Sequence, residues 1–190
     1  MSVVIAAKYR DGVVIASDRQ VTAGTLKHNN ATKIHKFKYS NSAIGVVGYL
    51  RDCNLMRVME EIVPYKDILD KVSITENYVT RVIVPAIYNY MNTNHRINTG
   101  EENGTMNSIM LYATKDRIFE IGEDFSVIEN EDSYLTIGCG NTKIIGYMAS
   151  IGDTSHYSKK DITVLLENAI KRACDKDAFI NDKIDFAYIN

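Results

Sequence analysis

The hydrophobic pattern of the first fifty residues is that of paired β-strands. Two runs rich in Val, Ile and Ala, residues 3–9 and 13–17, flank the turn residues Arg10-Asp11-Gly12, which predicts a hairpin of buried strands. An alternation of polar and apolar residues over 33–37 and a nearly continuous apolar run over 42–48 predict two more strands. The chain is therefore expected to begin as antiparallel sheet.

The spacing of apolar residues changes after residue 49. Helical spacing over residues 50–62 predicts a first helix, and the capping-box stretch from Ser73 to Glu76 predicts the start of a second, which runs through Tyr90. Pro85 lies inside this second helix and is expected to kink or split it, because proline lacks the donor and crowds the preceding turn. Residues 92–107 are polar and are predicted as a loop.

The second half of the chain repeats this block arrangement. The predicted strands are residues 108–113, 117–121, 126–128 and 134–137. The predicted helices are residues 141–151 and 160–174, and a closing strand covers residues 183–189. Blocks of strands and blocks of helices are typical of α+β proteins. We expect residues 1–190 to form one domain, a four-layer αββα sandwich with two antiparallel sheets between two helix layers.

Composition excludes several classes of protein. The 190 residues hold 22 Lys and Arg against 24 Asp and Glu, so the chain lacks the positive field that binds nucleic acid. No apolar stretch approaches the roughly 18 residues of a membrane span, so no membrane partner is expected. The three cysteines are far apart and lack C-x-x-C spacing, which favours a reducing, cytoplasmic location. The four histidines show no metal-ligand spacing, so neither a metal nor another cofactor is expected.

Ser2 is the first candidate for chemistry. Once Met1 is removed, the Ser2 hydroxyl lies beside its own free α-amine, whose unperturbed pKa near 8 suits a general base. A nearby lysine would lower the pKa of that amine, and a carboxylate would hold the lysine in place. Asp18 and Lys33 could serve, although taken singly they are an ordinary strand-end residue and an ordinary surface lysine.

Four stretches of this chain resemble the catalytic β subunits of the proteasome and the bacterial HslV protease, which are N-terminal nucleophile (Ntn) hydrolases. They are SVVIAAKYRDGVVIASDRQVTAG, ATKIHKF, IGVVGYLRD and LTIGCGN. The resemblance implies the Ntn hydrolase fold and a threonine-type or serine-type endopeptidase. It assigns Ser2 as the nucleophile, with Asp18 and Lys33 as the paired acid and lysine. Gly48 would donate to the oxyanion, since it ends a strand and opens a helix, where unpaired N–H groups gather.

The resemblance also implies residues around the substrate. Cys139 takes the place of a serine that positions the terminal amine, and Thr22, Val46 and Gly48 contact the substrate. Val46 falls where the family lines its first specificity pocket, so cleavage after apolar residues is expected. The protein would then assemble as homo-oligomeric stacked rings, cooperate with an AAA+ ATPase unfoldase and cut unfolded polypeptides inside the chamber.

Several residues depart from the family pattern. Ser2 replaces the usual threonine, and Tyr49 replaces the second of two glycines beside the oxyanion site. Either Asp175 or Asp177 matches an acidic residue of archaeal and eukaryotic β subunits, but Ile180 stands where those subunits have a serine. Two other functions stay open: a non-catalytic ring subunit, if the initiator methionine is retained, and an Ntn amidase that acts on a small molecule.

Overall fold

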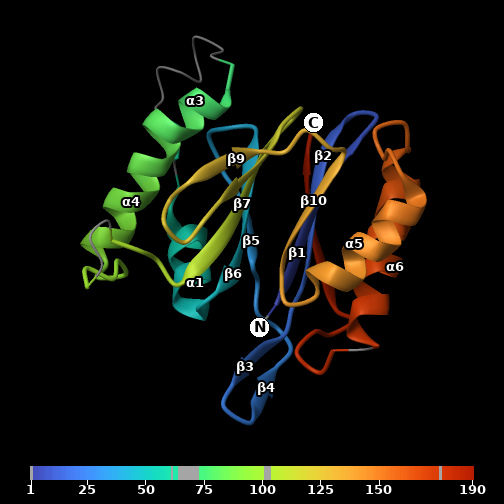
Figure 1. The fold of residues 1–190 in the computed structure, drawn as a ribbon, viewed down its shortest axis with the longest axis horizontal. Helices are drawn as coiled ribbons and strands as arrows, with labels where there is room; N and C mark the ends of the chain where they lie inside the picture. Colours follow the sequence, from blue (N-terminus) through green and yellow to red (C-terminus); the bar gives the residue numbers. More distant parts are fainter. Residues whose placement is uncertain (1, 61, 64–72, 101–103, 176) are drawn as a thin grey trace.

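Two antiparallel sheets form the centre of the computed structural model, which describes residues 2–60, 62–63, 73–100, 104–175 and 177–190 (Figure 1). The first sheet has the strand order β10-β1-β2-β11 and the second the order β5-β6-β7-β8-β9. The first sheet contains β1 (Val3–Tyr9), β2 (Gly12–Asp18), β10 (Tyr134–Gly138) and β11 (Ile184–Ile189). The second contains β5 (Ile34–Lys36), β6 (Ser42–Gly48), β7 (Ser108–Thr114), β8 (Ile118–Ile121) and β9 (Val127–Glu129).

Helices cover the outer face of each sheet. The five-stranded sheet is covered by α1 (Leu50–Val58) and by a continuous helical stretch composed of α3 (Glu76–Tyr78), η1 (Val79–Ile83) and α4 (Val84–Thr93). The four-stranded sheet is covered by α5 (Asn141–Ile151) and α6 (Lys159–Cys174) (Figure 1). The predicted four-layer sandwich is confirmed. Among the described helices, none is long and apolar enough to cross a membrane.

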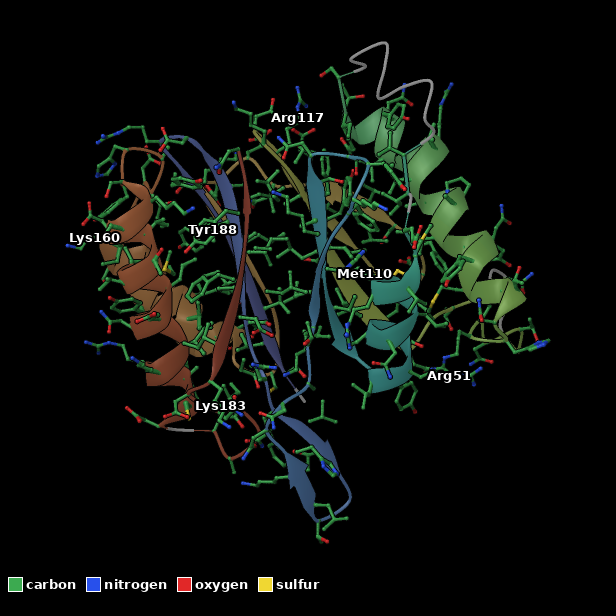
Figure 2. All side chains as sticks on the ribbon, turned by 180° about the vertical axis from the view of Figure 1, so that it is seen from behind. Arg51, Met110, Arg117, Lys160, Lys183 and Tyr188 are labelled. Atoms are coloured by element: carbon green, nitrogen blue, oxygen red, sulfur yellow. The ribbon has the colours of Figure 1, made fainter. Side chains whose placement is uncertain are left out.

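Strand β1 is buried on both of its faces. Val3, Ile5 and Ala7 pack against α5 and α6, whereas Val4 and Ala6 pack against the opposite sheet. This alternation follows from the two-residue period of a strand. The sheets approach closely at Gly45, where a Cβ atom would lie 2.5 Å from Cγ1 of Val4. Side chains fill the space between the sheets and between each sheet and its helices (Figure 2).

The two helices of the first half differ in detail from the sequence prediction. The first ends at Val58 instead of residue 62, and the second begins after Thr75, whose hydroxyl accepts from the N–H of Tyr78. Pro85 does not split the second helix. It follows the π-helical turn η1, in which the N–H of Val84 donates to the carbonyl of Val79. The wider turn accommodates the proline while the helix continues to Thr93.

A short hairpin that the sequence analysis did not predict projects beyond the two sheets. It consists of β3 (Val21–Ala23) and β4 (Leu26–His28), and Figure 1 shows it at the end of the molecule where the chain begins. All three residues of β4 are exposed, so the alternation that marks a half-buried strand is absent. The hairpin matters here because it lies beside the residues expected to carry the chemistry.

Candidate active site

Asp18 is the centre of a buried polar network at the start of the chain. Its side chain is 0% exposed. Oδ1 accepts from the N–H of Val3 at 2.9 Å and from Nζ of Lys33 at 2.6 Å, and Oδ2 accepts from the N–H of Gln20 at 2.9 Å. These three donors satisfy the carboxylate, as a buried charge requires. One oxygen therefore ties the backbone next to Ser2 to Lys33.

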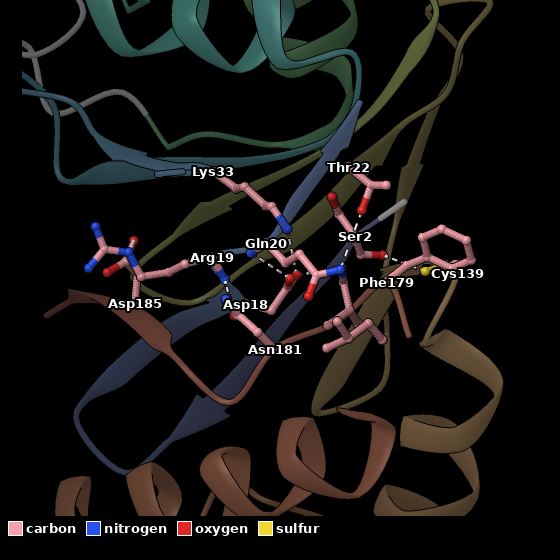
Figure 3. A network of polar contacts seen from close by, with 12 residues as sticks. Ser2, Asp18, Arg19, Gln20, Thr22, Lys33, Cys139, Phe179, Asn181 and Asp185 are labelled. Carbon is pink, nitrogen blue, oxygen red and sulfur yellow. Dashed lines mark hydrogen bonds and ion pairs between the residues drawn. The ribbon is translucent and has the colours of Figure 1, made fainter. Parts of the chain in front are cut away.

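The main-chain carbonyl of Ser2 is held by Cys139. The carbonyl oxygen accepts from the N–H of Cys139 at 3.0 Å, and the Cys139 thiol donates to the same oxygen at 3.4 Å. Gly138 permits this contact: its φ is +101°, and a Cβ there would lie 2.1 Å from the Ser2 oxygen. Figure 3 shows Ser2 beside Asp18 and Lys33, so the structure brings the three predicted residues together.

Lys33 is buried to the same degree as the carboxylate that binds it. Only 2% of the residue is exposed. Burial lowers the pKa of the Lys33 amine below its ordinary value, and the Asp18 carboxylate opposes that shift without cancelling it. A lysine with a lowered pKa next to a buried carboxylate is typical of functional sites. The interpretation of Lys33 as a surface lysine is excluded.

Gly48 ends β6 directly across the sheet from Ser108. Its φ is +132°, and a Cβ would lie 2.4 Å from both the carbonyl oxygen of Asn107 and Oγ of Ser108. The N-cap of α1 is Tyr49, so Gly48 lies one residue outside the helix. We expected its N–H to be one of the unpaired donors of the helix, and that expectation is wrong. The N–H instead lies beside the positive end of the helix dipole.

A second buried carboxylate, Asp52, lies at the junction between Gly48 and α1, and the sequence analysis missed it. Asp52 of α1 accepts from Nε of Arg96 at 2.5 Å and from Oγ of Ser108 at 2.7 Å. Oγ of Ser108 in turn accepts from the N–H of Tyr49 at 3.2 Å. The network fixes the junction between Gly48 and α1. Its members are up to 59 residues apart, so no local motif marks it.

Cys139 lies next to Asp177 rather than Asp175. Desolvation, first, and the Asp177 carboxylate, second, raise the pKa of the Cys139 thiol, so the thiol is protonated at neutral pH. Asp177 also accepts from the N–H of Phe179 at 2.9 Å. Ile180, which stands in place of the serine in related subunits, is buried. The proton network around Asp177 therefore differs from the one that the family pattern implies.

The comparisons with known proteins agree with this geometry. A family model described as Proteasome subunit matches residues 2–189. The chain belongs to the proteasome subunit family. Among solved structures, the crystal structure of eukaryotic HslV from Trypanosoma brucei is similar, with a TM-score of 0.67, 23% sequence identity and 97% of each chain covered. The expected Ntn fold, of the type found in HslV and the proteasome, is confirmed.

Two residues of this proteasome subunit that were predicted to contact the substrate, Thr22 and Val46, differ in their surroundings. Thr22, on β3, accepts from Nε2 of Gln20 at 3.3 Å. Val46 is 1% exposed and packs in the apolar cluster beneath α1, so its side chain is not at the surface. In the described part of the chain, no group of three or more His, Cys, Asp or Glu residues could hold a metal ion.

Proposed function

We propose that this proteasome subunit is a peptidase in which Ser2, freed of Met1, is the nucleophile. Oγ of Ser2 attacks the carbonyl carbon of a peptide bond while its proton passes to the α-amine of the same residue. The amine then gives this proton to the leaving nitrogen as the C–N bond breaks. Water hydrolyses the acyl ester by the same route and regenerates the hydroxyl. Met1 itself lies outside the described residues.

The shared oxygen of Asp18 is the observation that supports this proposal most strongly. Oδ1 accepts from both the N–H of Val3 and Nζ of Lys33, which places the cation next to the residue that carries the amine and the hydroxyl. A cation there favours the neutral amine and the developing alkoxide. Gly48, close to the positive end of α1, would donate its N–H to the oxyanion.

Assembly into rings is part of the same proposal. Two residues at the ends of α1, Tyr49 and Val58, are 56% and 64% exposed. Apolar side chains on one helix are typical of interfaces between subunits. We expect homo-oligomeric stacked rings in the cytoplasm, supplied with unfolded polypeptide by an ATPase. Light scattering that gives a stable monomer of 21.4 kDa at micromolar concentration would contradict the ring.

The nucleophile is tested by comparing two serine variants. Ser2→Ala should abolish hydrolysis of fluorogenic peptides, because it removes the attacking oxygen. Met1 is still removed in this variant, since alanine is also a small residue. Ser73→Ala changes an exposed serine far along the chain and should retain wild-type activity. Circular dichroism should show the same fold in both. Equal activity of Ser2→Ala and wild type would refute the mechanism.

The state of Met1 distinguishes the other two functions. A retained methionine blocks the amine and occupies the place of the substrate, so intact-mass spectrometry should show its loss in every active molecule. An Ntn-hydrolase inhibitor should then add its mass to Ser2. Protein from the native host that always keeps Met1 and hydrolyses nothing would be a non-catalytic ring subunit. A monomer that hydrolyses small amides but no peptide would be an amidase.

A further inference from the structure

A cavity of about 460 Å³ opens beside the candidate active site. Three chain segments that enclose it continue directly from site residues. Val21 precedes Thr22, Thr32 precedes Lys33, and Leu50 follows Gly48 by two residues. A cavity of this size can hold one side chain of a bound peptide. Its position makes it the natural place for a residue next to the bond that Ser2 would attack.

The charged groups of this cavity are cations. Lys27 and Arg57 are cations, and His28 adds an imidazole. The amides of Asn29, Asn30 and Asn54 line the same space. In the described structure none of its lining residues is acidic. This is a local excess of positive charge, because the whole chain has a net charge of −2.

Two walls present these cations toward the same space. Lys27 pairs with Thr22 across the β3–β4 hairpin, and directly paired residues place their side chains on the same face. On α1, Leu50, Asn54 and Arg57 are spaced by four and three residues, so they lie on one face of the helix. In the part of the chain that the structure describes, neither Lys27 nor Arg57 has an ion-pair partner.

We infer that this cavity selects an acidic side chain, Asp or Glu, on the acyl side of the cleaved bond. The inference rests on the proposed peptidase function. The carbonyl that Gly48 would polarise belongs to the acyl-side residue, so that residue's side chain lies closest to the wall formed by Leu50 and Arg57. An unpaired cation and amide donors bind a carboxylate through charge-assisted hydrogen bonds. The buried Val46, on which the expectation of an apolar preference rested, is not among the residues that line the cavity.

The hydrolytic test uses two peptides that differ only in charge. Fluorogenic peptides with Glu or Gln immediately before the leaving group should give a Glu/Gln ratio of kcat/KM well above one. Arg57→Gln should lower that ratio about fivefold, the effect of losing one partly exposed ion pair. Arg57→Glu should lower it further, and raised salt should reduce it in the wild type. Lys160→Gln, on the opposite helix layer (Figure 2), is the matched control and should leave the ratio unchanged.

Binding measured without turnover separates this inference from the proposed function. Fluorescence anisotropy with the Ser2→Ala protein should give tighter binding of the Glu peptide than of the Gln peptide, and Arg57→Gln should remove most of the difference. Equal affinities would overturn the inference even if Ser2 hydrolyses peptides. Preferential binding of the Glu peptide, with no Ser2-dependent hydrolysis by the wild type, would support the cavity's selectivity and refute the peptidase.

Discussion

Replacing Lys33 with methionine tests how much the buried ion pair contributes to stability. The substitution removes the cation and leaves the Asp18 side chain, 0% exposed, without its ion-pair partner. Losing one partner of a buried pair typically costs about 3–5 kcal/mol. For a chain of this length each kcal/mol lowers the melting temperature by about 2–4 °C. We therefore expect the melting temperature of Lys33→Met to lie about 6–20 °C below that of the wild type at the same protein concentration.

Two further variants make this measurement specific. Lys36→Met is the matched control, because Lys36 lies on β5, is exposed and donates from Nζ to the carbonyl of Tyr188. It should cost less than about 1 kcal/mol. The double variant Lys33→Met with Asp18→Asn keeps an acceptor for the N–H of Val3 and leaves no unpaired charge. It should recover more than half of the loss. Urea unfolding followed by circular dichroism measures all three.

The lowered pKa of Lys33 also predicts how the stability difference between the wild type and Lys33→Met changes with pH. The pKa of Lys33 is lowered from 10.5 in the folded protein, so between the folded value and 10.5 the unfolded chain binds more protons. The free energy of unfolding of the wild type therefore rises with pH in that window, and this pH-dependent gain is lost as pH falls through the folded pKa. Its difference from Lys33→Met should widen as pH approaches 10.5. A Lys33→Met variant as stable as Lys36→Met at every pH would refute the argument.

Three other predictions follow from the site. Gly48→Ala should destabilise the protein by more than about 1–3 kcal/mol in urea unfolding, because the φ of Gly48 is +132° and its surroundings leave no room for a Cβ atom. Gly146 lies in open space on a helix, so Gly146→Ala should instead stabilise the protein by about 0.5–1 kcal/mol. Asp52→Asn should lower kcat about tenfold with little change in KM, because it loosens the junction that positions Gly48; an effect on KM alone would contradict this role. A thiol reagent at pH 8 should label exposed Cys139 before buried Cys53, whose pKa is raised to about 11 by desolvation, and peptide mapping that finds the reverse order would contradict the site geometry.

The sequence predicted the sandwich because each of its sheets is built from strands with a strong apolar pattern. Strand β1 and its hairpin partner lie in the core on both faces, so their residues read as continuous apolar runs. The β3–β4 hairpin was missed because its exposed side chains carry no such pattern. The π-helical turn before Pro85 was missed as well, since five residues are too few for apolar spacing to distinguish a π-helix from an α-helix.

The candidate site was predictable where residue chemistry and the family pattern agree. Ser2, Asp18 and Lys33 were candidates from the chemistry of a free N-terminal serine and were assigned roles by the resemblance, and the structure brings them together. Asp52 and Ser108 could not be recognised, because their contact joins elements 56 residues apart. The cations beside the site belong to the unpredicted hairpin and to an exposed face of α1, where charged residues are ordinary. Only the structure shows that these cations line the same cavity.

The site straddles the two sheets. Ser2 and Asp18 adjoin β1 and β2, whereas Lys33 and Gly48 adjoin β5 and β6. Gly45 lets the sheets approach until a Cβ would meet Val4 at 2.5 Å, so the thickness of the apolar interior sets the separation of Ser2 and Lys33. Gly45→Ala would push β1 away from β6 and shift Ser2 relative to Lys33 without contacting either residue. The geometry of this site is therefore controlled by residues that lie entirely inside the core.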